Sequence, residues 1–286
     1  KAVGEAIRRA VKRAGAKATD VAVAISGDAA ITKVIQMSAG LSARDLEGQV
    51  EIQADQYIPF PMEEVSFDYE IIGPNEKDPE LMDVLLVATR TENVEQRQSA
   101  VNAAGLAAQV VDVEAFALEN ACQLLSHQLP DGGMGHSVAV VDIGASSTTF
   151  SVLEDLKVIY TRDFNFGGQQ LTEEIMRTYG LSMEDAGRAK KQGGLPSNYQ
   201  PEVLEPFIDD MTQQVSRSLQ FYLASGGGRE QPDMIVVCGG CANIPGIADV
   251  ISSRVGIPTE VGDPLGQMKI SSKAKSQGVH KDATAL

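Results

Sequence analysis

The sequence has 286 residues, of which 43% are hydrophobic, and its formal net charge is −15. This length and apolar content predict a folded chain of one large or two modest domains and exclude a disordered one. The acidity argues against a nucleic-acid partner, because binding a phosphate backbone needs a basic face.

The cysteines and the apolar runs bear on the compartment. The three cysteines, Cys122, Cys238 and Cys241, are odd in number, which predicts no disulfide framework and indicates a reducing compartment. The sequence shows no charged-then-apolar leader and no apolar run of about 18 residues. We therefore expect no direct insertion into a membrane.

Residues 1–15 have the pattern of a short amphipathic helix. Val3, Ile7 and Val11 lie at helical spacing with Lys and Arg between them, and Gly15 ends the pattern. A basic amphipathic helix can contact a membrane, but this apolar stripe consists mostly of small residues, which favours packing against a core. Residues 20–26, D-V-A-V-A-I-S, predict a buried strand.

Residues 31–105 predict the order strand, helix, strand, strand, helix. We expect strands at 31–37, 65–72 and 81–88, and helices starting at Ser42 and Thr91. Asp45 follows Ser42 by three residues, as in a capping box, and Pro59 and Pro61 end that helix.

Residues 110–125 predict a short strand that runs into a helix. Asp112 and Glu114 lie at the start of this helix, where carboxylates are stabilised by unpaired N–H groups and the helix dipole.

Residues 137–153, S-V-A-V-V-D-I-G-A-S-S-T-T-F-S-V-L, predict two strands joined by a tight turn. The turn carries Gly144, Ser146 and Ser147, and Asp142 precedes it. Glycine lets backbone N–H groups approach phosphate oxygens, hydroxyls add donors, and an aspartate can hold Mg²⁺ through water. Taken alone, the stretch fits an ordinary polar hairpin equally well.

The second half continues with alternating strands and helices. We expect a strand at 158–164, helices at 169–179, 184–191 and 207–224, a linker at 193–206 and a buried strand from Met234. The pair Gly167-Gly168 opens the first of these helices, and such a pair lets backbone amides face a phosphate.

Cys238-Gly-Gly-Cys241 has C-x-x-C spacing, which admits a redox or a zinc site. A zinc site needs two further ligands, and the candidates are Cys122 and three scattered histidines. We favour a structural interpretation, in which the cysteines are small buried residues.

The order of strand, hairpin, Gly-Gly-helix and a second strand ending in Gly-Gly resembles the superfamily of actin, DnaK-type chaperones and sugar kinases. Four stretches resemble the PilM family, the FtsA-like component of type IV pilus assembly. They are A-D-Q-Y-I-P-F-P at 54–61, V-V-D-V-E-A-F-A-L at 110–118, A-G-R-A-K-K-Q-G-G-L-P at 186–196, and Q-V-S-R-S-L-Q-F at 214–221.

This resemblance implies an α/β protein with the actin-like ATPase fold and an FtsA-like inserted βαββα subdomain of the 1C type. Residues 1–28 with 110–135 would form part of the first actin-like domain (1A), residues 29–109 the insert, and residues 136–286 the second actin-like domain (2A/2B). The family's first phosphate loop and its C-terminal return segment have no counterpart here, so we expect a chain trimmed at both ends.

The resemblance also implies a site for ATP and Mg²⁺. The implied nucleotide-binding residues are Asp142, Gly144, Ser146, Ser147, Thr148, Gly167, Gly168, Lys190, Gly239, Gly240 and Asn243. Asp142 would hold Mg²⁺ through water, and Glu114 would orient the attacking water as the catalytic residue.

Two departures from the family pattern bear on this site. The FtsA-like G-G-G-T-T-D becomes G-A-S-S-T-T, which replaces an acid by Thr149, and the Glu of A-E-x-x-K becomes Gly187. Nucleotide binding therefore remains the expectation, with weak or absent hydrolysis.

By resemblance, the protein is a cytoplasmic scaffold at the inner face of the inner membrane. Its partners would be the N-terminal cytoplasmic peptide of the membrane protein PilN and the platform and motor components of pilus assembly. The alternatives are an FtsA-like cell-division protein, a sugar or acid kinase, and a secretion-system homologue of the GspL type.

Overall fold

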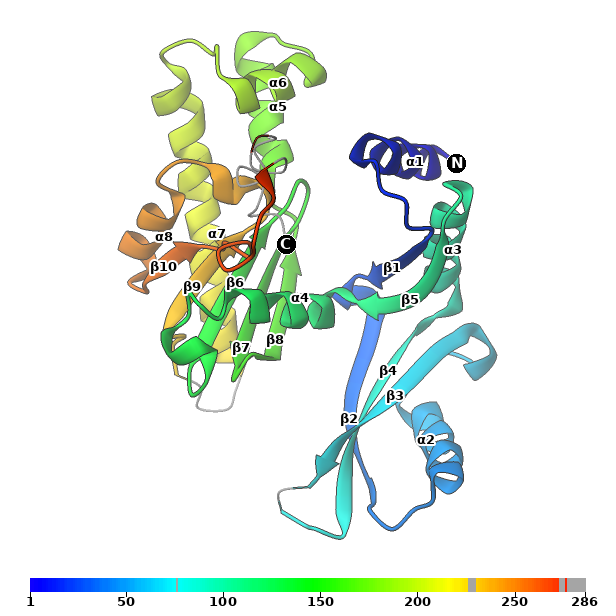
Figure 1. The fold of residues 1–286 in the computed structure, drawn as a ribbon. Coiled ribbons are helices and arrows are strands. Elements are labelled where there is room, and N and C mark those ends of the chain that lie inside the picture. The colour runs from blue at the N-terminus through cyan, green and yellow to red at the C-terminus, as the bar shows by residue number, and fades with distance from the viewer. Residues whose placement is uncertain (76, 226–229, 273–275, 277–286) are drawn as a thin grey trace. The chain divides into compact units, whose positions relative to one another are not determined.

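A computed structural model describes residues 1–75, 77–225, 230–272 and 276 of the chain (Figure 1). The chain forms two compact units, residues 1–117 and 118–286, which are described separately below. The predicted division into three domains stays a prediction.

A three-stranded sheet and two helices form the βαββα part of the first unit. The elements are β2 (Ala30–Ser38), α2 (Ala43–Tyr57), β3 (Val65–Pro74), β4 (Leu81–Arg90) and α3 (Thr91–Ala103). The sheet is antiparallel, in the order β2-β4-β3. The Ser42 hydroxyl accepts a hydrogen bond from the Asp45 N–H at 3.3 Å, so the predicted cap is confirmed.

Alternation along the strands places one apolar face of this sheet under α2. Val84 and Leu86 of β4 are buried together with Leu46, Val50 and Ala54 of the helix. The predicted order of elements in this region is therefore confirmed.

The remainder of the first unit is a parallel strand pair with two helices. Strands β1 (Asp20–Ile25) and β5 (Ala107–Val113) pair along their length, and α3 packs against them. Helix α1 (Ala2–Ala14) contacts α3, and Gly4 is its buried residue. The expected packing of α1 against the rest of the protein is therefore confirmed, although Val3 of its apolar stripe is 62% exposed.

Helix α4 (Glu114–Cys122) begins where β5 ends, and the boundary between the two units falls within it. Short turns of 3₁₀ helix follow at Gln123–Leu125 and Pro130–Gly133. Across the part of the chain that the structure describes, no helix combines the length and the apolar content needed to span a bilayer.

The second unit is built on a five-stranded sheet in the order β10-β9-β6-β7-β8. Its strands are β6 (Ser137–Ile143), β7 (Thr148–Glu154), β8 (Lys157–Phe164), β9 (Met234–Cys238) and β10 (Thr259–Val261). Strands β6, β9 and β10 are parallel, whereas β7 and β8 run antiparallel to their neighbours. The predicted hairpin is thus confirmed as β6-turn-β7.

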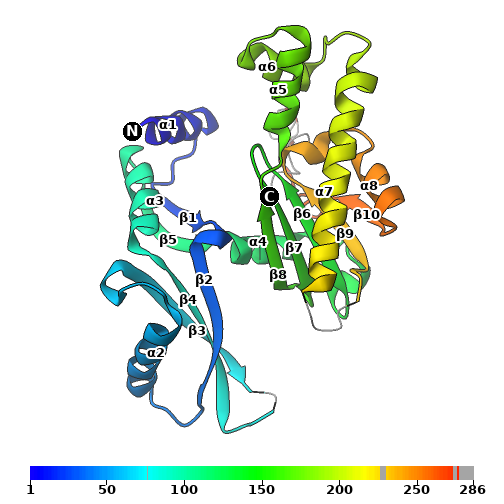
Figure 2. The same cartoon turned by 180° about the vertical axis from the view of Figure 1, so that it is seen from behind.

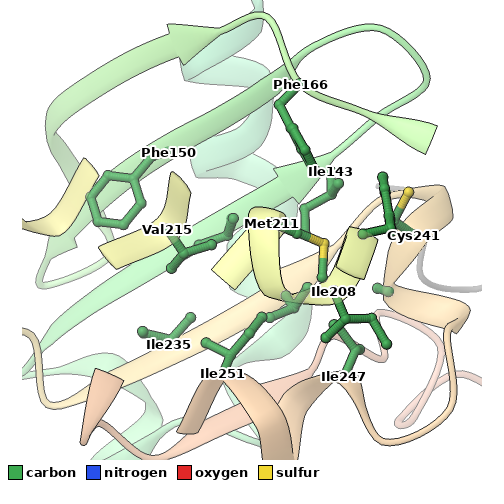
Figure 3. Packing of buried hydrophobic residues seen from close by; sticks show 14 of the residues in the cluster. Ile143, Phe150, Phe166, Ile208, Met211, Val215, Ile235, Cys241, Ile247 and Ile251 are labelled. Carbon is green, nitrogen blue, oxygen red and sulfur yellow. The ribbon is translucent and has the colours of Figure 1, made fainter. Parts of the chain in front are cut away.

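Helix α7 crosses one face of the sheet, and α5 and α6 lie beyond one end of it (Figure 2). The helices are α5 (Gly168–Tyr179), α6 (Met183–Gln192), α7 (Glu205–Ala224) and α8 (Ile247–Val255). Alternate strand residues such as Ile143, Phe150 and Ile235 pack against Met211 and Ile251 from α7 and α8 (Figure 3). The predicted linker at 193–206 needs correction, since Gln200–Leu204 forms a π-helical turn that leads into α7.

The opposite face of this sheet carries a second, smaller cluster. Val138 and Val140 of β6 and Val236 of β9 pack there with Cys122 and Leu125. Because side chains alternate along a strand, Asp142 lies on this second face, at the end of β6.

Candidate functional site

The turn between β6 and β7 is held by its own backbone. The Gly144 N–H donates to the Ser147 carbonyl at 3.0 Å, and Ser146 and Ser147 are exposed at the tip. The tip therefore presents two accessible hydroxyls, and their contact with a phosphate stays a prediction.

Thr148, at the start of β7, has a different role. Its side chain is 1% exposed, and its hydroxyl donates to the Phe166 carbonyl at 2.7 Å. The predicted phosphate contact of Thr148 is corrected, because its proton is already donated inside the protein.

The start of α5 packs directly on the hairpin turn. The N–H groups of Gly168 and Gln169 donate to the carbonyls of Gly144 and Ala145, at 3.0 and 2.7 Å. A Cβ atom at Gly167 would lie 2.5 Å from the Ala145 oxygen, so only glycine fits there. The predicted phosphate contact of the Gly168 amide is thus corrected to support of the turn.

The turn after β9 approaches the end of β6 equally closely. Gly239 has a φ of +80°, and a Cβ there would lie 2.3 Å from Asp142 Oδ1 and 2.5 Å from the Ile143 oxygen. Gly240 and Asn243 are exposed, and no heavy atom would lie within 4 Å of a Cβ at Gly240. Gly239 therefore shapes the site, while Gly240 and Asn243 remain accessible to a ligand.

Three oxygen-bearing side chains lie in a row across β6, β7 and β8. Asp142 is opposite Thr149, and Thr149 is opposite Asp163. Directly opposed residues of antiparallel strands lie on the same face of a sheet. The Thr149 hydroxyl donates to Asp163 Oδ1 at 2.5 Å.

Asp163 is a site residue that the sequence reasoning missed. Residues 148–153 and 158–164 both alternate, and their short connection predicts an antiparallel pair. Aligning the two strands in that way would have placed Asp163 opposite Thr149. Asp163 therefore supplies a carboxylate on the same face of the sheet as Thr149, which replaces the acid of the FtsA-like pattern.

The electrostatics of this row favour a cation. Burial raises the pKa of Asp142, and the nearby charge of Asp163 raises it further. A divalent cation would offset this repulsion, and Mg²⁺ accepts one or two carboxylates with water and phosphate oxygens completing its shell. The donor set at this strand end therefore fits Mg²⁺.

Lys190 of α6 reaches the start of α5. Its ammonium donates to the Gly168 carbonyl and the Thr172 hydroxyl, both at 2.7 Å, and burial lowers its pKa. Lys190 thus fastens α6 to α5, which leaves one of its three N–H donors for a ligand. Gly187, which stands where the resemblance implied a carboxylate, lies one turn earlier on α6.

The cysteines are buried, unpaired in disulfides and weakly acidic. Burial raises the pKa of Cys122 to about 12, and it raises the pKa values of Cys238 and Cys241 as well. Reactive and metal-binding cysteines have lowered pKa values. The structural interpretation of C-x-x-C is therefore the one that the environment favours.

Glu114 belongs to a different compact unit from these residues. It is the exposed first residue of α4 and belongs to the first compact unit, whereas the hairpin belongs to the second. Its catalytic role stays a prediction.

Comparison with known proteins identifies relatives of two kinds. Cell division protein FtsA of Bacillus subtilis (strain 168) is 29% identical over 154 residues, which cover 44% of this chain and 34% of the relative. FtsA of Enterococcus faecalis (strain ATCC 700802 / V583) is 25% identical over 143 residues, 43% of this chain and 32% of the relative. The match thus spans about a third of each FtsA.

A much longer likeness concerns pilus assembly. A chain of the solved PilM-PilN type IV pilus biogenesis complex is 26% identical, with a TM-score of 0.74 over 99% of this chain and 81% of that chain. The family model described as type IV pilus assembly protein PilM matches residues 1–286. The predicted α/β, actin-like fold and the PilM resemblance are therefore confirmed, and the chain belongs to the family of the type IV pilus assembly protein PilM.

Proposed function

We propose that this chain acts in type IV pilus assembly as a nucleotide-binding scaffold that docks a short peptide of a PilN-type partner. The observation that carries the proposal is the likeness, over 99% of the chain, to a chain of the PilM-PilN complex. A likeness of this extent covers both compact units, which supports a role shared with that chain.

The nucleotide would bind at the hairpin. The exposed hydroxyls of Ser146 and Ser147 would donate to phosphate oxygens, and Gly240 and Asn243 would lie beside the nucleoside. Asp142, with Asp163 behind Thr149, would hold Mg²⁺ through water. Bound Mg²⁺ would neutralise charge on the phosphates.

The hydrogen bonds at the start of α5 support nucleotide binding without efficient hydrolysis. The amides of Gly168 and Gln169 are engaged by the hairpin, so they cannot stabilise charge that develops on a phosphate. The carboxylates of Asp142 and Asp163 are suited to holding a cation. The nucleotide would then stabilise the bound conformation by mass action.

The docked peptide would be the cytoplasmic N-terminus of PilN, a membrane protein, which would bring the scaffold to the inner face of the inner membrane. Cytoplasmic location and contact with platform and motor components belong to the same proposal. The net charge of −15 supports a partner other than nucleic acid.

Two assays of the full-length protein test the proposal. Calorimetric titration with a peptide from the cytoplasmic end of PilN should give saturable binding, whereas a scrambled peptide of the same composition should not bind. ATP hydrolysis measured in parallel should stay far below roughly 1 s⁻¹, the low end of ordinary enzymes. Turnover at that rate together with no peptide binding would establish an enzyme instead.

A further inference from the structure

Helix α1 and the residues just after it concentrate positive charge in an otherwise acidic chain. Residues 1–19 contain six Lys or Arg residues and a single acid, Glu5, which gives a net charge of +5. Because the whole chain carries −15, the remaining residues carry −20. The hairpin site uses none of these cations.

Helix α1 is held along one side only. Helix α1 approaches α3 so closely at Gly4 that a Cβ there would lie 2.6 Å from the Ala103 side chain. The Arg8 guanidinium donates to the Ala103 and Ala104 carbonyls at the end of α3. These contacts fix the helix where it meets the end of α3 (Figures 1 and 2).

The other cations of this segment face solvent. Their side chains belong to exposed residues: Lys1, Arg9, Lys12, Arg13 and Lys17. At 100° per residue, the three that lie on the helix fall within an arc of roughly 100°. Glu5, the one acid of the segment, falls within the same arc, so the three cations surround a single carboxylate.

The shape beside this arc disfavours an acidic peptide as the occupant. The hollow next to α1, of about 660 Å³, is lined by Glu92 and Glu95 of α3 and by Lys1, so its carboxylates outnumber its one basic side chain and disfavour an anionic chain. A nucleic acid is disfavoured as well, because specific binding to a long phosphate backbone needs a basic face that extends beyond this short segment, and the remainder of the protein carries −20. A flat anionic surface can meet the exposed cations of α1 without entering the hollow.

We propose that α1 docks on an anionic phospholipid surface, with Arg9, Lys12, Arg13 and Lys17 directed at the headgroups. Four or more basic residues on an amphipathic helix are typical of binding to anionic lipid. The acidic remainder of the chain is repelled by the same surface, so the contact also orients the protein. The choice of a lipid rests in part on the proposed function, in which the docked peptide belongs to a membrane protein.

Vesicle flotation tests this proposal with the full-length protein, without peptide or nucleotide, so that failure of the docking proposal leaves the result interpretable. The vesicles contain phosphatidylcholine alone or with about a third phosphatidylglycerol. We expect binding to the anionic vesicles only, with at least tenfold loss when salt rises from about 0.05 to about 0.3 M. Replacing Arg9, Lys12, Arg13 and Lys17 by Gln should weaken binding on the order of 100-fold.

A charge-matched variant distinguishes the position of the charges from their number. Arg44, Lys191, Arg217 and Lys269 are exposed cations elsewhere in the chain, and replacing them by Gln changes the net charge equally. This control should bind anionic vesicles like the wild type. Absence of wild-type binding, or an equal loss in both quadruple variants, would overturn the proposal.

An acidic protein partner is a further outcome of the same experiment. If the wild type ignores anionic vesicles but binds a polyglutamate peptide in a way that the α1 variant abolishes, the surface recognises protein and the lipid proposal is wrong. Circular dichroism should give the same spectrum for all three proteins. Should the α1 variant fail to fold, the salt and lipid dependence of the wild type still decides the question.

Discussion

Gly239 lies where the end of β9 passes closest to the end of β6, and its surroundings leave no room for a side chain. Its φ of +80° is unfavourable for other residues, and an added Cβ would meet both Asp142 and the Ile143 carbonyl. We expect Gly239→Ala to lower the free energy of unfolding by about 2–4 kcal/mol. Denaturant unfolding curves measure this change.

Gly240 provides the matched control for this substitution. It is the next residue along the chain and is exposed. A Cβ atom at this position would have no heavy atom of another residue within 4 Å. Gly240→Ala should change the unfolding free energy by no more than about 0.5 kcal/mol. Equal losses in the two variants would contradict the steric explanation.

At the scale of the elements, His136 joins the starts of β6 and β9 to the turn before them. Its Nε2 lies 3.2 Å from an Asp131 carboxylate oxygen and its Nδ1 lies 3.1 Å from Asp233 Oδ2. The hydrogen bonds with Asp131 and then Asp233 raise the pKa of His136. The pKa of Asp233 is lowered mainly by the hydrogen bond that it accepts from the Ser137 N–H, and further by its interaction with His136.

These shifts predict how stability depends on pH. A raised histidine pKa contributes stability that is fully present below about 6.5, the usual value, and is lost as pH rises through the raised one. The destabilisation caused by His136→Gln should therefore be largest near pH 5–6 and should shrink towards pH 9. Thermal unfolding of both proteins across this range measures it, and a difference independent of pH would show that the imidazolium contributes nothing.

At the scale of the whole molecule, the proposed nucleotide should stabilise the protein through Asp142. A ligand at about 100 times its Kd adds about 2.7 kcal/mol of stability, so Mg-ATP should raise the Tm of the full-length protein by roughly 5–10 °C. Asp142→Asn should remove the part of this rise that depends on Mg²⁺. The exchange is nearly isosteric, so the fold should persist.

Differential scanning fluorimetry with and without a chelator measures that rise. Asp249→Asn, which alters an exposed carboxylate on α8, is the control and should respond to Mg-ATP like the wild type. An unchanged magnesium dependence in Asp142→Asn would leave the hairpin with a structural role alone.

Local patterns in the sequence were enough to predict the secondary-structure elements and the turns that surround the site. Turn chemistry between two apolar runs predicted the hairpin of β6 and β7, and periodicity with the Ser42 cap predicted the βαββα order. These signals are local, because hydrogen bonds within a turn or a cap join residues only a few positions apart. The PilM resemblance rested on short motifs and was confirmed over residues 1–286.

Which polar groups remain accessible to a ligand depends on how distant segments pack, and this could be seen only in the fold. The Gly168 N–H donates to a carbonyl 24 residues away, and the Thr148 hydroxyl donates to a carbonyl 18 residues away. The Lys190 ammonium donates to two oxygens of α5 that lie 18 and 22 residues away in the sequence. Asp163 joins Asp142 only through the register of three strands. These hydrogen-bond partners are set by the packing of segments that are distant in sequence. A local sequence pattern therefore cannot predict which donor pairs with which acceptor.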